Sequence, residues 1–267
     1  MSDGPILAEG SFIRALRVQM NVLGALIMRE LHTRFGRENL GYLWLFIEPM
    51  ILAGCVALLH EMSGHGLPGG MMIFPFYIIS YTPHYLLRAI LTRAPGAMDA
   101  NLPLFYHARV RLHDVLMART ILETAAVLIA MIAFLVGIGI VADVWPQDPV
   151  LVAGGLVMTA VLMHGLGVMV CAATAFGHAT VERVVHPATY LALPMSGAFF
   201  MMWWMPEGFR DVMWWVPTVH IYELIREAYY GPIVPYYYDL GYLAAWMLAS
   251  NAIGLLTLRV ARPHMEA

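Results

Sequence analysis

The sequence predicts an all-α integral membrane protein with six transmembrane helices, and three observations lead to this fold class. First, 60% of the 267 residues are hydrophobic and only 12% are charged, whereas a soluble globular chain carries about 25% charged residues. Second, apolar stretches long enough to cross a bilayer recur along the chain, and residues 149–181 contain no Asp, Glu, Lys or Arg. Third, the basic residues, all of them arginines, concentrate on one side of the spans that these stretches define.

Residues 1–39 are expected to form an N-terminal cytoplasmic segment with an amphipathic interface helix. Its apolar residues follow the three-and-four spacing of one helical face: Phe12, Leu16, Met20, Leu23, Ile27 and Leu31. Arg14 and Arg17 fall elsewhere on the helix, where they can meet anionic headgroups. A soluble amphipathic helix is the alternative.

Residues 40–260 are expected to form the six-span transmembrane domain, followed by a cytoplasmic tail at 261–267. The first span is interrupted by Glu48-Pro49 and the second contains Pro83, so both are expected to kink. The later spans carry few or no charges over their length. The expected spans lie at about 40–60, 71–91, 115–141, 149–181, 184–206 and 240–258.

Two connections are more elaborate than simple loops. Residues 93–114 form a compact basic loop in which a short helix with exposed aromatics is suited to docking on another protein. Residues 207–239 contain short apolar helices broken by proline and glycine, which is typical of re-entrant structure. The alternatives are a solvated loop held by topology alone and, for the second segment, local ion pairing that fixes a helix.

The distribution of arginines predicts the orientation in the membrane. If both termini are cytoplasmic, thirteen arginines lie inside and only Arg210 and Arg226 lie outside. The positive-inside rule therefore places the N- and C-termini in the cytoplasm.

The sequence lacks the common signatures of catalysis. Without any lysine the chain cannot carry a nucleotide-binding P-loop. The nucleophile elbow G-x-S-x-G is missing, and no two histidines have the spacing of a zinc protease. We therefore expect no catalytic residue, no metal and no cofactor in this chain.

Three motifs, in order, resemble the membrane subunits of polysaccharide-exporting ABC transporters, of the Kps capsule-export permease type. The first runs from Arg29-Glu30-Leu31-His32-Thr33-Arg34-Phe35-Gly36 through Leu40-Gly41-Tyr42-Leu43-Trp44 to Glu48-Pro49. The second spans Asn101 to Asp114, and the third spans Pro217 to Glu227. Val216 stands where the family pattern has asparagine, so it offers no side-chain cap to the helix that follows.

The resemblance implies a type 2 ABC exporter permease in the bacterial inner membrane. It implies that the chain pairs with itself and with two copies of a separate ATPase subunit that binds ATP and Mg. The implied substrate is a lipid-linked capsular polysaccharide, which periplasmic and outer-membrane export proteins would carry onward. No nucleic-acid partner is expected.

The resemblance also suggests roles for particular residues, in three groups. Residues expected to border the substrate path are Arg34, Arg37, Tyr42, Trp44, Phe46, Glu48, Arg88 and Arg93. Residues expected to couple to the ATPase are Leu104, Phe105, Tyr106, Arg109, Arg111 and Asp114. The outer re-entrant motif is expected to comprise His220, Glu223, Arg226 and Glu227.

Several alternatives stay open from the sequence. The arginines can serve topology and lipid headgroups, and the aromatic residues can serve helix packing and the interfacial belt. The exported molecule can be another glycan, such as O-antigen or teichoic acid, or a drug or lipid. A different class of protein, an intramembrane enzyme or a transporter without ATPase, would function when purified alone.

Overall fold

The computed structural model describes residues 6–35, 41–64, 66–105, 110–176 and 180–265 of the chain. These residues form helices joined by short turns and contain no strand. The elements in chain order are α1 (Ile6–Phe35), α2 (Gly41–Met62), η1 (Pro68–Gly70), α3 (Ile73–Arg93), η2 (Pro95–Ala97), η3 (Asp99–Asn101), α4 (Leu102–Phe105), α5 (Leu112–Ala142), α6 (Pro149–Ala175), α7 (Thr180–Leu191), η4 (Leu193–Met195), η5 (Met202–Trp204), α8 (Glu207–Met213), α9 (Pro217–Tyr230) and α10 (Leu240–Met265).

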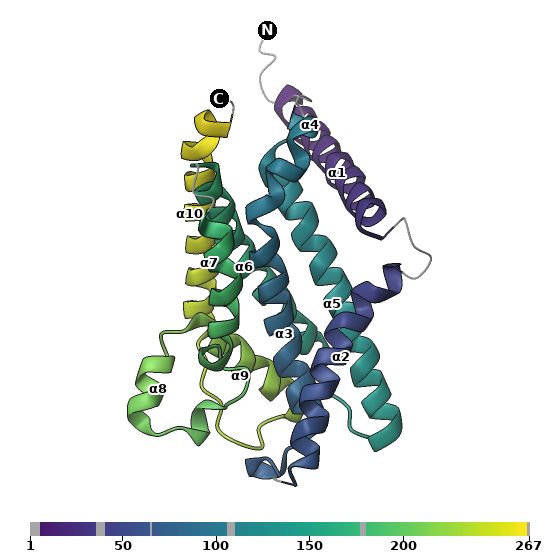
Figure 1. Cartoon of the computed structure of the whole chain (residues 1–267), viewed down its shortest axis with the longest axis vertical. Helices are drawn as coiled ribbons and strands as arrows, with labels where there is room; N and C mark the ends of the chain where they lie inside the picture. Colours follow the sequence, from purple (N-terminus) through teal and green to yellow (C-terminus); the bar gives the residue numbers. More distant parts are fainter. Residues whose placement is uncertain (1–5, 36–40, 65, 106–109, 177–179, 266–267) are drawn as a thin grey trace.

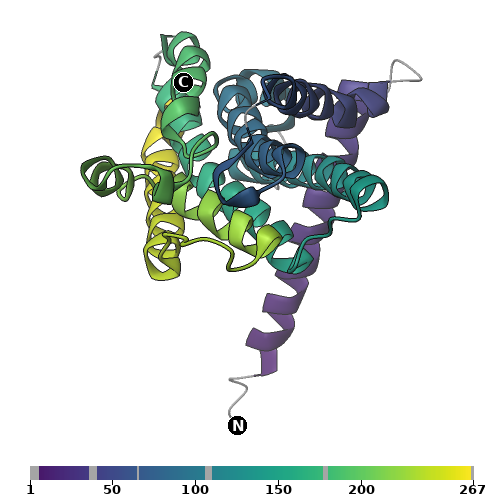
Figure 2. The same cartoon turned by 90° about the horizontal axis from the view of Figure 1, so that it is seen from below.

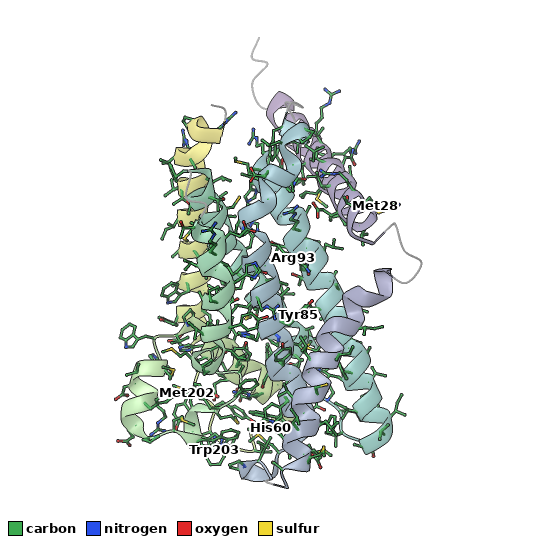
Figure 3. All side chains as sticks on the ribbon, in the orientation of Figure 1. Met28, His60, Tyr85, Arg93, Met202 and Trp203 are labelled. Atoms are coloured by element: carbon green, nitrogen blue, oxygen red, sulfur yellow. The ribbon has the colours of Figure 1, made fainter. Side chains whose placement is uncertain are left out.

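The long helices form an elongated bundle whose two ends differ. The short helix α4, the start of α1 and the end of α10 lie at one end, and α8 and α9 lie at the other (Figure 1). Seen along the bundle, α1 extends away from the other helices on one side (Figure 2). In the side-chain view, His60, Met202 and Trp203 lie toward the end that holds α8 (Figure 3).

Three helices among the described residues are long and apolar enough to cross a membrane, namely Leu112–Ala142, Pro149–Thr174 and Leu240–Pro263. They correspond to the third, fourth and last of the expected spans. Local signals set their ends: Pro149 opens α6 at a position that needs no N–H donor, and Asp148 Oδ1 accepts the Leu151 N–H at 2.9 Å. Asp143 closes α5 in a left-handed conformation with φ 54°.

The main hydrophobic core lies where α3, α5, α6 and α9 meet. Ile78, Leu86, Met131, Leu156 and Ile225 are all buried there. In water, burial of such side chains is the principal favourable term in folding. Between helices inside a bilayer, close contact of small residues becomes more important.

Small residues bring α6 and α10 into close contact. A Cβ added to Gly165 would lie 2.5 Å from the backbone carbon of Ser250, and one added to Gly254 would lie 2.7 Å from the Gly165 carbonyl oxygen. Asn251 Nδ2 also donates to the Val161 carbonyl at 2.9 Å. This seam therefore needs glycine at both positions.

The fifth expected span, at 184–206, is not one continuous helix. The helix α7 ends at Leu191, and the chain continues through η4 and a non-helical stretch to Met201. Gly197 has φ +94°, and a Cβ there would lie 3.1 Å from the Cα of Val219 on α9. The backbone thus leaves helical geometry where it passes close to α9.

Candidate functional site

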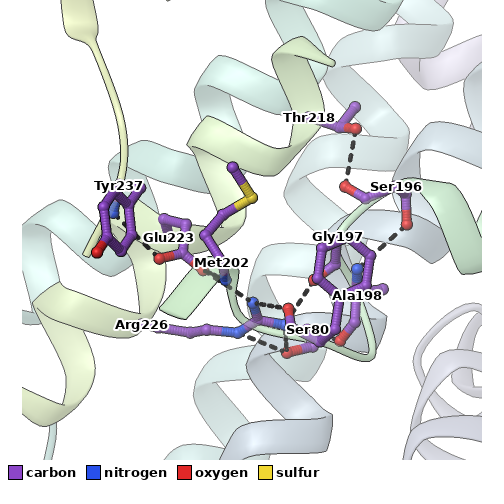
Figure 4. Close-up of polar contacts among 10 residues, drawn as sticks. Ser80, Ser196, Gly197, Ala198, Met202, Thr218, Glu223, Arg226 and Tyr237 are labelled. Atoms are coloured by element: carbon purple, nitrogen blue, oxygen red, sulfur yellow. Dashed lines mark hydrogen bonds and ion pairs between the residues drawn. The ribbon is translucent and has the colours of Figure 1, made fainter. Parts of the chain in front are cut away.

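A buried arginine organises the end of the molecule that holds α8 and α9. Arg226, on α9, is 1% exposed, and its Nη1 lies 3.6 Å from Glu223 Oε1. Its Nη2 donates to Ser80 Oγ of α3 at 2.9 Å (Figure 4). Its guanidinium also lies 4.5 Å from the ring centre of Phe76. A buried charge is tolerated only when paired and hydrogen-bonded, and both conditions hold here.

The same guanidinium donates hydrogen bonds to backbone carbonyls of the non-helical stretch that follows α7 and η4. Arg226 donates to the carbonyl oxygens of Gly197 at 2.8 Å, Ala198 at 2.8 Å and Phe200 at 2.7 Å. Carbonyls outside a helix cannot remain unpaired in an apolar environment, because each would carry its full desolvation penalty. Arg226 therefore supplies the hydrogen-bond donors that these three carbonyls need where the helix is interrupted.

Glu223 and His220 hold the segments on either side of α9. Glu223 accepts the backbone N–H of Met202 and that of Tyr237, both at 3.2 Å. His220 Nε2 donates to the Trp214 carbonyl at 2.7 Å, and its Nδ1 accepts the Asp239 N–H at 2.9 Å. These two bonds fix a neutral tautomer, and burial lowers the pKa of His220.

The fourth residue of the outer motif, Glu227, is half-buried. Its backbone carbonyl accepts the Gly231 N–H at 2.7 Å, where α9 ends. As expected from Val216, α9 begins without a side-chain cap. Pro217 takes the first helical position instead.

A polar groove lies beside α8 on the same end of the molecule. Its volume is about 390 Å³, within the size range of small-molecule sites. Arg210 Nη1 donates to the Tyr237 hydroxyl at 2.9 Å across it. The sequence analysis did not single out this groove.

At the opposite end, polar contacts tie α1 to the start of α5 and to the expected coupling loop. Gln19 Nε2 donates to Asp114 Oδ1 at 2.6 Å, and the backbone N–H of Arg111 donates to Asp114 Oδ2 at 2.9 Å. Arg29 Nη2 donates to Asn101 Oδ1 at 2.7 Å. These hydrogen bonds join α1 to the expected coupling loop.

A chain of charged residues continues from α1 into the bundle. Glu30 Oε1 accepts from Arg119 Nε at 3.1 Å, and Arg119 Nη1 donates to the Arg93 carbonyl at 3.3 Å. Arg93 in turn pairs with Glu123. The crevice between these residues and His164 has a volume of about 10 Å³, the size of one water molecule.

Residues expected to couple to the ATPase fall into three classes in the structure. Arg111 is exposed. Leu104 and Phe105 are half-buried and pack with Leu23 and Leu26 of α1, and Asp114 is buried by the contacts above, so these three side chains face inward. Tyr106 and Arg109 lie outside the described residues.

Only two of the residues expected along the substrate path have described side chains. Arg93 is held by Glu123, as above. Arg88 is half-buried, with its guanidinium 4.4 Å from the ring centre of Tyr190. Arg37 lies outside the described residues, as do the side chains of Arg34, Tyr42, Trp44, Phe46 and Glu48.

Sequence reasoning missed the partners that these residues find. Ser80, Gln19, Asn101 and Tyr190 each meet a charged side chain from a distant part of the chain. The sequence feature that could have pointed to these partners is the presence of isolated polar residues within apolar stretches. Within the described residues, no group of three His, Cys, Asp or Glu side chains is placed to hold a metal ion.

Comparison with known proteins gives one consistent family. The family model of the ABC-2 type transporter matches residues 21–230. The capsule polysaccharide export inner-membrane protein CtrC of Neisseria meningitidis is 33% identical over 252 residues, which is 93% of this chain and 94% of CtrC. The corresponding protein BexB of Haemophilus influenzae is 30% identical, covering 94% of this chain and 95% of BexB. The polysialic acid transport protein KpsM of Escherichia coli is 29% identical, covering 93% and 96%.

Proposed function

Because the chain belongs to the ABC-2 type transporter family, we propose that it is the membrane subunit of an exporter that moves a lipid-linked capsular polysaccharide across the bacterial inner membrane. The observation that carries this proposal is the similarity to three capsule or polysialic acid export proteins over more than nine-tenths of the chain. ATP is hydrolysed by a separate subunit, because this sequence has no P-loop lysine.

The active assembly is a homodimer bound to two copies of the ATPase, and the glycan passes between the two permease copies. Each copy crosses the membrane six times, with α7 and the broken segment after it forming the fifth crossing. The arrangement of α4 and α8 at opposite ends supports a cytoplasmic coupling end and a periplasmic end (Figure 1). Periplasmic and outer-membrane export proteins continue the path from the second end.

The helix α1 lies in the cytoplasmic membrane interface. Leu23 and Leu26 pack on α5, while Phe12, Leu16 and Met20 are exposed together with nearby arginines. Such a distribution suits a helix with its apolar side in the acyl boundary.

ATP-driven closure of the ATPase dimer moves the coupling loop at 93–114. Because Asn101 and Asp114 are hydrogen-bonded to Arg29 and Gln19, movement of the loop displaces α1 and α5 together. The helix α2 follows α1 in the chain, so this displacement reaches the start of the first span.

The test is complementation of a bacterial strain whose own capsule-export permease gene is deleted. The intact chain, expressed with its ATPase partner, is expected to restore surface capsule and to co-purify with that ATPase in mild detergent. Failure of the ATPase to co-purify, or transport by the purified chain alone, would contradict the proposal. An ATPase variant that cannot hydrolyse ATP serves as the control and should leave capsule inside the cell.

A further inference from the structure

Arg88 is distinct from the other arginines inside the helical bundle. Arg93 pairs with Glu123, Arg119 with Glu30, and Arg226 with Glu223. Arg88, by contrast, makes no ion pair with any residue that the structure describes, and its guanidinium contacts the ring of Tyr190. A cation inside the membrane is costly unless it faces a partner, a cavity or water, so the Arg88 guanidinium is suited to receive a counter-charge from outside the chain.

Tyr190 belongs to a polar stripe on α7. Glu182, His186 and Tyr190 follow one another at intervals of four residues, which places them on one helical face, and all three are exposed. The helix α7 lies alongside α3 and α6 in the bundle (Figure 1). Polar residues on such a helix face a water-filled path or another chain and not lipid.

The contact between Arg88 and Tyr190 leaves ligand-binding groups available. Tyr190 is 54% exposed, and its hydroxyl makes no hydrogen bond within the described part of the chain. The ring holds the guanidinium from one side by a cation–π contact. The guanidinium retains planar N–H donors that match a carboxylate or phosphate in a bidentate manner.

We propose that Arg88 and Tyr190 form a binding site for an acidic sugar unit of the exported glycan. The guanidinium binds the carboxylate or phosphate, while the open face and hydroxyl of Tyr190 contact the sugar ring. Arg93, five residues further along α3, does not serve this role because Glu123 already neutralises it. This site deepens the proposed function and rests on it.

Binding can be measured with the full chain in nanodiscs of phosphatidylcholine, which removes anionic headgroups as competitors. The probes are a sialic acid oligomer, which has a carboxylate on every unit, and a neutral dextran oligomer of equal length. The acidic oligomer is expected to bind more tightly than dextran. Arg88→Gln should weaken its binding by about tenfold, as expected for loss of a charge-assisted hydrogen bond.

Variants separate charge from geometry. Arg88→Lys keeps the charge without the planar fork and should lose less affinity than Arg88→Gln. Tyr190→Leu should weaken binding more than Tyr190→Phe, which keeps the ring. Arg183→Gln, which removes an exposed arginine from the same helix α7, should bind as the wild type does. Equal melting temperatures of all variants establish that the differences do not arise from unfolding.

Three outcomes would overturn the site. The first two are absence of acidic-oligomer binding to the wild-type chain and equal affinity of Arg88→Gln and wild type. The third, measured in separate nanodiscs that contain phosphatidylglycerol, is Arg88-dependent retention of that lipid without oligomer binding. The complementation assay distinguishes the two proposals. If wild type and Arg88→Gln both restore capsule fully, the site is wrong and the exporter assignment stands; if wild type restores none, the exporter assignment fails.

Discussion

The charge of Arg226 is stabilised by its surroundings and stabilises them in return. One carboxylate, one hydroxyl and three backbone carbonyls accept from it or face it, and they come from α9, α3 and the segment after α7. The sequence predicted that His220, Glu223 and Glu227 share one helical face and that Arg226 adjoins Glu223. Their distant partners were not predictable, because nothing in the pattern relates residue 226 to Ser80, 146 positions earlier.

Replacement of Arg226 tests this role. Arg226→Gln should lower the free energy of unfolding by about 3–5 kcal/mol, because it leaves Glu223 buried without its counter-charge. The measurement is the thermal stability of the purified chain in detergent. Arg210→Gln removes an arginine from the same outer segment whose partner Glu207 is 91% exposed, and should have a smaller effect. Equal losses for the two variants would contradict a special role for Arg226.

The stability of the outer segment is expected to depend on pH through His220. Burial lowers its pKa in the folded state, and Asp239 opposes this shift while Tyr242 and Trp214 pack on the ring. The folded state therefore binds fewer protons than the unfolded state, so stability is present above the ordinary pKa of about 6.5 and is lost as the pH falls below it. Protonation of Nδ1 would also break its bond from the Asp239 N–H.

A pH series of melting temperatures measures this effect. The wild type should lose stability between about pH 7.5 and pH 5.5. His220→Gln, which does not titrate, should begin less stable and lose less over the same range. If the melting temperatures of both proteins fall by the same amount on acidification, a group other than His220 is responsible.

Whole helices were predicted more successfully than their interruptions. The spans at 115–141 and 240–258 correspond to α5 and α10, because long uninterrupted apolar stretches determine a helix of membrane length. Residues 184–206 were predicted as one continuous span because they are uncharged, but the helix ends at Leu191, and composition alone does not reveal where backbone carbonyls will find an arginine. The hydrogen bonds that join α1 to the predicted coupling loop could not be predicted from the sequence, because they depend on tertiary packing.

The link between α1 and α5 is expected to be required for coupling. Asp114→Asn replaces a buried acceptor of two hydrogen bonds and should weaken the link by about 1.5–3 kcal/mol. ATPase activity of the complex should persist while capsule export falls. Asp99→Asn makes the same chemical change at an exposed position of the same loop and should export normally. Normal export by Asp114→Asn at wild-type protein levels would argue against transmission through this contact.

The seam between α6 and α10 gives a packing prediction. Gly165→Ala would place a methyl group 2.5 Å from the backbone of α10, and overpacking of this kind costs about 1–3 kcal/mol. Gly154→Ala changes a glycine of the same helix with open space around its Cβ position, and should be neutral or slightly stabilising. Melting temperatures in detergent compare the two. Similar changes in melting temperature for both substitutions would mean that α6 and α10 do not pack as closely at Gly165 as the structure shows.

The two polar networks of the molecule lie at opposite ends of the helical bundle. The hydrogen-bonded unit of α1, η3 (directly before α4) and the start of α5 lies at one end, and the Arg226 network with α8 and α9 lies at the other (Figure 1). In the topology predicted from the sequence, thirteen of the fifteen arginines lie on the side of the membrane that holds both termini. The positive-inside rule therefore predicts that the first end is cytoplasmic.

Cysteine labelling in spheroplasts tests that orientation. In a background lacking Cys55 and Cys171, Ser63→Cys and Glu207→Cys should react with a membrane-impermeant maleimide added outside, since both positions are exposed at the proposed periplasmic end. Arg111→Cys and Arg183→Cys, exposed at the proposed cytoplasmic end, should react only after permeabilisation. The reverse labelling pattern would mean that the chain has the opposite orientation in the membrane. Labelling of Ser63→Cys and Arg111→Cys from the same side would mean that α3 does not cross the membrane. Because α3 carries Arg88 and Ser80, its crossing is what places the proposed sugar site and the Arg226 network on one path through the bilayer.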